Sequence, residues 1–206
     1  AGADALDGGS GSDTADYSAS AAAVVVGLDG TTGAGGDAQG DTLANIEAIT
    51  GSAFNDILTG SAAADTLDGG AGDDTLQGMA GADVLDGGGG IDIADYSASD
   101  AGIVAGLDGR ANTGGDAAGD VYTSIEGITG SGFADELHGS VNADILRGSG
   151  GDDTLFGSLG ADSIEGGAGF DTADYGASNS AVDVNLQTGT GSGGHAEGDQ
   201  LNGIER

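Results

Sequence analysis

The chain lacks cysteine, proline, tryptophan and lysine, and it has little aromatic or basic character. Among its 206 residues are 3 Lys or Arg, 4 Tyr and 4 Phe, against 35 Asp or Glu, so the formal net charge is −32. Without cysteine there are no disulfides and no thiolate metal sites or nucleophiles. The charge predicts repulsion from nucleic acid and anionic membrane surfaces, and no apolar run is long enough to span a bilayer. We therefore expect no nucleic-acid partner and no membrane insertion.

Glycine is abundant, at 46 residues, and the chain repeats itself. So much glycine disfavours helices, and the low aromatic content with high charge is close to the composition of disordered chains. A shift of 79 positions aligns Tyr17 with Tyr96 and Tyr175. We interpret the chain as one continuous domain, 1–206, made of about 2.6 copies of a 79-residue unit (1–79, 80–158 and 159–206).

Inside each unit lies a period of nine residues. Five consecutive blocks start at Gly51 and five more at Gly130; Gly opens each block, Asp is sixth, and Leu, Ile or Ala is eighth. A block has room for one tight turn and one three-residue strand, whose middle residue points inward. Two blocks make an 18-residue coil, and stacked coils form parallel sheets around a thin core. The sequence thus predicts an all-β fold, a parallel β-roll or β-solenoid, with nonapeptide runs at 1–16, 51–95 and 130–174.

The spacers between these runs cover residues 17–50, 96–129 and 175–206. Each begins with an apolar stretch, continues through a Gly-rich turn and ends in a degenerate nonapeptide. In the first spacer that segment starts at Gly36 and keeps Asp41 sixth and Leu43 eighth. We therefore expect the spacers to be modified coils of the same solenoid and not flexible linkers.

Stacked coils place identical turns about 4.8 Å apart, so the sixth-position carboxylates would form rows that repel unless cations lie between them. The available ligands are carboxylate and carbonyl oxygens, which suit Ca²⁺. The candidate ligands in the nonapeptides are Asp4, Asp13, Asp56, Asp65, Asp74, Asp83, Asp92, Asp135, Asp144, Asp153, Asp162 and Asp171. The candidates that keep the same phase in the spacers are Asp41, Asp120 and Asp199.

Because one coil contains two nonapeptides, each Asp should neighbour the Asp that is 18 residues away. The predicted neighbours are Asp56–Asp74, Asp74–Asp92, Asp65–Asp83, Asp135–Asp153, Asp153–Asp171 and Asp144–Asp162. Glu47, Glu126 and Glu205 each follow an inward Ile, and the pattern leaves open whether they cap a coil end or close a calcium site.

The nonapeptides GGAGDDTLQ (69–77) and GGAGFDTAD (166–174) resemble the RTX (repeats-in-toxin) calcium-binding family, whose repeat reads GGxGxDxUx with U an aliphatic residue. The resemblance extends over the whole chain. It implies a parallel β-roll with several Ca²⁺ ions bound in its turns, export by a type I secretion system, and folding in external calcium. Position four departs from Gly at Phe54, Ala63, Phe133 and Asn142, which bears on the geometry and affinity of those turns.

Other residue types carry no catalytic pattern. His138 and His195 have no counterparts in the other copies, so we expect surface positions and no transition-metal site. Tyr17, Tyr96 and Tyr175, with Phe54 and Phe133, recur at unit ends, and we expect them to plug the solenoid where its coil changes shape. No GxSxG elbow with a histidine partner occurs. We therefore predict that the chain is not an enzyme.

The function that we expect is a calcium-binding structural repeat region of a secreted bacterial protein. An adhesin, biofilm matrix, surface layer or extracellular filament would use such an array, with self-association as a further expectation. The alternative is a non-catalytic module that assists secretion and folding of an attached exoenzyme, such as a protease, lipase or alginate epimerase. A catalytic domain elsewhere in the protein would favour the alternative.

Overall fold

The computed structural model describes residues 2–206, and its contacts divide the chain into two units. Unit 1 comprises the described residues up to Asp95 together with Gly119–Ile125, and unit 2 comprises Tyr96–Ala118 and Glu126–Arg206. Nearly all regular structure in the described part is β-strand, joined by turns and three short 3-10 helices. None of the helices in residues 2–206 is long and apolar enough to cross a membrane. The expectation of one continuous solenoid over 1–206 stays a prediction.

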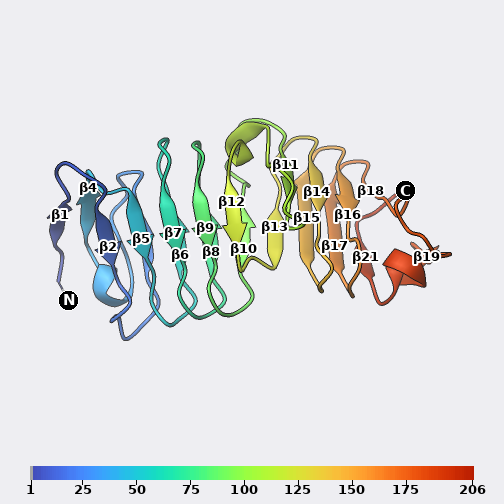
Figure 1. The fold of residues 1–206 in the computed structure, drawn as a ribbon, viewed down its shortest axis with the longest axis horizontal. Coiled ribbons are helices and arrows are strands. Elements are labelled where there is room, and N and C mark those ends of the chain that lie inside the picture. Colours follow the sequence, from blue (N-terminus) through green and yellow to red (C-terminus); the bar gives the residue numbers. More distant parts are fainter. Residues whose placement is uncertain (1) are drawn as a thin grey trace. The chain divides into compact units, whose positions relative to one another are not determined.

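Unit 1 is built from short parallel strands that stack side by side (Figure 1). One sheet has the order β3-β6-β8-β10, a second has the order β2-β5-β7-β9-β12, and β1 pairs with β4. The strands are β1 (Ala5–Asp7), β2 (Thr14–Asp16), β3 (Val25–Gly27), β4 (Thr42–Ala44), β5 (Ala48–Thr50), β6 (Ile57–Thr59), β7 (Thr66–Asp68), β8 (Thr75–Gln77), β9 (Val84–Asp86), β10 (Ile93–Asp95) and β12 (Val121–Thr123).

Unit 2 repeats this arrangement, with one sheet in the order β13-β15-β17-β21-β20-β19 and another in the order β11-β14-β16-β18. Only the pairings β19–β20 and β20–β21 are antiparallel among these. The strands are β11 (Val104–Gly106), β13 (Gly127–Thr129), β14 (Glu136–His138), β15 (Ile145–Gly150), β16 (Thr154–Phe156), β17 (Ser163–Ala168), β18 (Thr172–Ala173), β19 (Asp183–Asn185), β20 (Thr190–Ser192) and β21 (Gln200–Asn202).

The strand register has the predicted 18-residue step, as in Leu58 of β6 opposite Leu76 of β8. Both leucines are fully buried, whereas the neighbouring Ile57 is 42% exposed. Because side chains alternate across a strand, the eighth residue of a block points inward and its neighbours point outward; Leu6, in the first block, is 38% exposed. The core of each unit is therefore a narrow column of single aliphatic side chains. The predicted all-β parallel β-roll is confirmed.

The spacer strands take part in the same sheets. In unit 1, β3 pairs with β6 and β5 pairs with β7, both in parallel. The Gly-rich turn contains the 3-10 helix η1 (Gly36–Ala38), and unit 2 has η2 (Gly115–Ala117) and η3 (Gly194–Ala196) at the equivalent places. The spacers thus continue the strand ladders instead of looping out.

Candidate metal sites

The sixth-position aspartates form hydrogen-bonded ladders at the turns of each unit. The backbone N–H of Asp56 donates to Oδ1 of Asp74 at 2.7 Å, one coil further on. All six neighbour pairs predicted from the sequence are joined in this way. The other five are Asp74–Asp92 (2.8 Å), Asp65–Asp83 (2.9 Å), Asp135–Asp153 (2.8 Å), Asp153–Asp171 (2.9 Å) and Asp144–Asp162 (2.9 Å).

The spacer aspartates occupy the same rows. Asp41, Asp120 and Asp199 use Oδ1 to accept the backbone N–H of the preceding aspartate in their row. These hydrogen bonds join Asp4 to Asp41 (2.8 Å), Asp83 to Asp120 (2.9 Å) and Asp162 to Asp199 (3.0 Å). All fifteen candidate ligands therefore lie at turns where carboxylates stack. Their role as calcium ligands stays a prediction.

Glutamate takes the place of aspartate in at least two of these rows. Oε2 of Glu47 accepts the N–H of Asp13 at 3.0 Å, and Oε2 of Glu205 accepts the N–H of Asp171 at 2.8 Å. The sequence pattern alone leaves the role of these glutamates open. The signal that places Glu47 in the row is its spacing, because it stands 18 residues before Asp65.

The turns are of two kinds, and position four separates them. Where position four is Gly, that residue has a positive φ, such as 121° at Gly72, and the second residue is left-handed as well, such as 97° at Gly70. We call these the open turns. In five of them Oδ2 of the aspartate is buried and accepts no hydrogen bond; these aspartates are Asp13, Asp74, Asp153, Asp162 and Asp171.

Where position four is another residue, the serine at position two caps the aspartate. Ser61 donates to Oδ2 of Asp65 from its backbone N–H at 2.6 Å and from Oγ at 2.8 Å. Ser131 donates its N–H to Oδ2 of Asp135 at 2.6 Å and its Oγ hydroxyl to Oδ1 at 2.8 Å. Ser52 and Ser140 make this same pair of contacts with Asp56 and Asp144. In these serine-capped turns Oδ2 of the aspartate therefore accepts the hydrogen bond that it lacks in the open turns.

Burial of the open carboxylates changes their protonation. Asp74 and Asp162 are each 1% exposed. Loss of solvation raises the pKa of Asp74 to about 6 and the pKa values of Asp153 and Asp162 to about 7, with a smaller upward contribution from neighbouring aspartates. A proton or a cation would each offset the cost of burying such a carboxylate.

The open turns have the donor chemistry of a calcium site. A Cβ added to Gly81 would lie 2.5 Å from the carbonyl oxygen of Ala63 and 2.6 Å from Oδ1 of Asp83. Carbonyl oxygens of one coil thus face carboxylate oxygens of the next, which is the all-oxygen donor set that Ca²⁺ prefers. Within residues 2–206 no three Asp, Glu or His side chains converge on one point. A cation in these turns would therefore take backbone carbonyls as ligands beside the aspartates.

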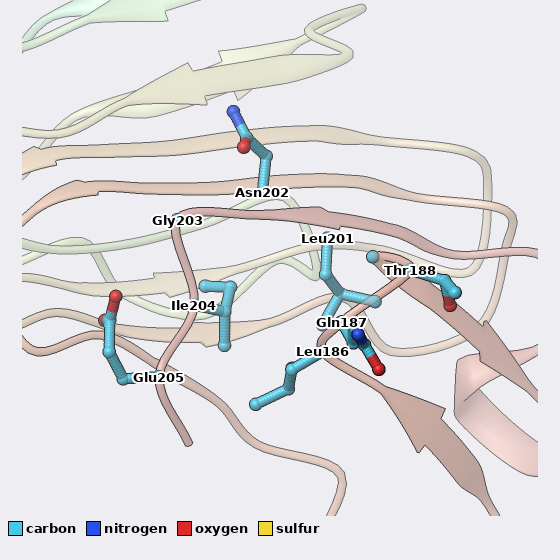
Figure 2. A pocket seen from close by; sticks show the side chains of 9 residues that line it. Leu186, Gln187, Thr188, Leu201, Asn202, Gly203, Ile204 and Glu205 are labelled. Atoms are coloured by element: carbon cyan, nitrogen blue, oxygen red, sulfur yellow. The ribbon is translucent and has the colours of Figure 1, made fainter.

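Two hollows lie in unit 2. Figure 2 shows one of about 390 Å³ beside β21, where Leu186, Leu201 and Ile204 present apolar side chains and Glu205 lies at the edge. The other, of about 280 Å³, is lined by groups that include Arg110 and His138. Arg110 there pairs with Asp108 at 2.9 Å. Neither hollow presents a catalytic constellation.

Two expectations for single residues are wrong. His138 is buried and not on the surface, because its ring stacks on Phe156 with centroids 4.2 Å apart and its Nε2 lies 2.6 Å from Oε1 of Glu136. Burial lowers the pKa of His138. Phe54 and Phe133 do not plug the solenoid, since they stand 45% and 50% exposed at position four of serine-capped turns. Tyr17 and Tyr96 are buried as expected.

A parallel β-roll whose turns stack carboxylate and carbonyl oxygens belongs to the class of cation-binding repeat proteins. More specifically, the chain belongs to the RTX calcium-binding nonapeptide repeat family, whose model matches residues 1–15, 41–76, 59–94, 128–155 and 138–173, more than half of the chain. No curated protein matches the chain. The chain is thus a calcium-binding repeat module, and this family and fold are typical of non-catalytic repeats.

Proposed function

We propose that the chain is a secreted structural module that folds when Ca²⁺ enters its open turns. The observation that supports this most directly is the set of buried Oδ2 atoms without hydrogen bonds at Asp13, Asp74, Asp153, Asp162 and Asp171. Buried polar atoms normally have partners. A cation beside each of these oxygens would supply the missing interaction, and the all-oxygen surroundings favour Ca²⁺.

The size of the electrostatic repulsion also favours a cation. Two carboxylates about 4.8 Å apart repel by roughly 3 kcal/mol at an effective dielectric constant of about 20. Six neighbouring pairs of this kind together exceed or match the roughly 5–15 kcal/mol by which a typical domain is stable. The ionised rows would therefore not remain folded alone, and binding to the folded state only would make stability rise with the calcium concentration.

Secretion and a structural role are the finer part of the proposal. RTX repeats are typical of secreted proteins, and extracellular calcium modules bind in the range of about 10⁻⁴–10⁻³ M. Low calcium inside the cell would leave the chain unfolded for export, and external calcium would fold it. The repeated 79-residue unit suits an array that spans distance in an adhesin, biofilm matrix, surface layer or filament.

Far-ultraviolet circular dichroism tests calcium-dependent folding. The spectrum is recorded in EGTA and then during a Ca²⁺ titration, with Mg²⁺ at equal concentration as the control. We expect a disordered spectrum in EGTA that converts cooperatively to β-structure with Ca²⁺ and not with Mg²⁺. A folded spectrum that EGTA leaves unchanged would refute the proposal.

A further inference from the structure

Two tyrosines make the same contact with two spacer aspartates. Oη of Tyr17 lies 3.1 Å from Oδ2 of Asp41, and Oη of Tyr175 lies 2.8 Å from Oδ2 of Asp199. In each case the tyrosine opens the spacer and the aspartate follows 24 residues later. An ionised carboxylate only accepts hydrogen bonds, so the tyrosine hydroxyl is the donor.

These aspartates otherwise resemble those of the open turns. Oδ1 of Asp199 accepts the N–H of Asp162 at 3.0 Å, just as Oδ1 of Asp171 accepts the N–H of Asp153 at 2.9 Å. The difference lies in the second oxygen, because Oδ2 of Asp171 and of Asp153 is buried without a hydrogen bond. The hydroxyl of Tyr175 supplies Asp199 with the partner that these two lack.

A hydroxyl donor and a calcium ion compete for this oxygen. Ca²⁺ binds carboxylate oxygens at about 2.3–2.6 Å, and the donated proton of Tyr175 points along the line to Oδ2 of Asp199. Asp41 and Asp199 are 3% and 1% exposed. Burial, followed by the charge of Asp41, raises the pKa of Tyr17, so its hydroxyl keeps its proton at neutral pH.

We propose that the hydroxyls of Tyr17 and Tyr175 take the place of calcium at Oδ2 of Asp41 and Asp199. These two aspartates are then hydrogen-bond acceptors and not calcium ligands. This inference rests on the proposed function, since it decides which aspartates bind the ions. It removes two residues from the fifteen candidate ligands. It also gives the 79-residue unit a calcium-free coil wherever a spacer tyrosine reaches its aspartate.

The test compares Asp199→Asn with Asp162→Asn in the full chain. Asparagine keeps an oxygen that accepts the N–H of the preceding aspartate, and it removes the negative charge. Bound Ca²⁺ per chain is counted by equilibrium dialysis at saturating calcium. We expect Asp162→Asn to lose at least one ion and Asp199→Asn to keep the wild-type number. Loss of an ion from Asp199→Asn would overturn the proposal.

A second variant, Tyr175→Phe, removes only the donor. We expect it to bind no fewer ions than the wild-type chain and to unfold at a lower temperature in saturating calcium, because Oδ2 of Asp199 loses its partner. An unchanged unfolding temperature would overturn the proposal. If the wild-type chain binds no calcium at all, the proposed function fails. The difference in unfolding temperature between Tyr175→Phe and the wild-type chain then still decides whether the hydroxyl stabilises the carboxylate of Asp199.

Discussion

Asp73 and Asp74 are adjacent in the sequence, and the fold gives them different surroundings. Asp74 is 1% exposed, whereas Asp73 is exposed and accepts the N–H of Ile91 at 2.9 Å. Asp74 also stands between two aspartates of its row, since it accepts from Asp56 and donates to Asp92. A single residue of this kind contributes to two neighbouring turns.

Substitution of Asp74 should therefore cost more than substitution of Asp73. We expect Asp74→Ala to lose at least one bound Ca²⁺ and to shift the folding midpoint to about tenfold or more higher calcium, as disturbance of groups around metal ligands commonly does. Asp73→Ala is the matched control and should keep the wild-type ion count. Isothermal titration calorimetry measures both quantities, and equal losses in the two variants would contradict the proposed ligand assignment.

At the scale of the element, the nonapeptide turn depends on the glycine at position four. Gly72 has a φ of 121°, which residues with a side chain rarely adopt. A Cβ at this position would also lie 2.5 Å from the carbonyl carbon of Phe54 in the preceding coil. Both the conformation and the close stacking of coils thus require glycine there.

Gly72→Ala should accordingly destabilise the calcium-loaded chain by about 1–3 kcal/mol, which is the usual cost of a strained backbone. Gly89→Ala is the control, since Gly89 has no positive φ and a Cβ there would meet nothing within 4 Å. Urea unfolding in saturating calcium measures both free energies. The position-four interpretation fails if the two variants lose equal stability.

The strands of the nonapeptide runs were predictable because the period of nine residues fixes them. Position eight is the inward residue in each block, and the 18-residue step follows from two blocks per coil. The hydrogen bonds from the spacer tyrosines to the aspartates were less predictable. Tyr175 and Asp199 are 24 residues apart, and only the stacking of the spacer coil brings Oη and Oδ2 together. The exposure of Phe54 likewise follows from a turn geometry that its aromatic character does not reveal.

At the scale of the whole molecule, charge couples folding to both calcium and protons. The net charge of −32 and the sequence pI of about 4.1 show how few cationic groups balance the acids. Protonation of buried carboxylates is the alternative to cation binding, because either one removes the cost of a buried negative charge. Protons and calcium should therefore compete for the open turns.

The pH dependence follows from the pKa values of about 6 for Asp74 and about 7 for Asp153 and Asp162, against an ordinary value of 3.8. The folded state holds more protons than the unfolded state between these values, so in EGTA its stability should fall as the pH rises from about 4 to 7. The calcium-loaded chain and the unfolded chain both hold these aspartates ionised above about pH 5, so folding on calcium takes up or releases few protons there. The pH dependence therefore belongs to the calcium-free fold.

Circular dichroism in EGTA at several pH values measures this dependence. The variant Asp153→Asn/Asp162→Asn removes the two aspartates whose pKa values are raised to about 7. Without calcium, the stability of this variant should depend less on pH between about 4 and 7 than that of the wild-type chain. If the stability of the wild-type chain in EGTA does not fall as the pH rises through this range, burial does not raise the pKa values of these aspartates.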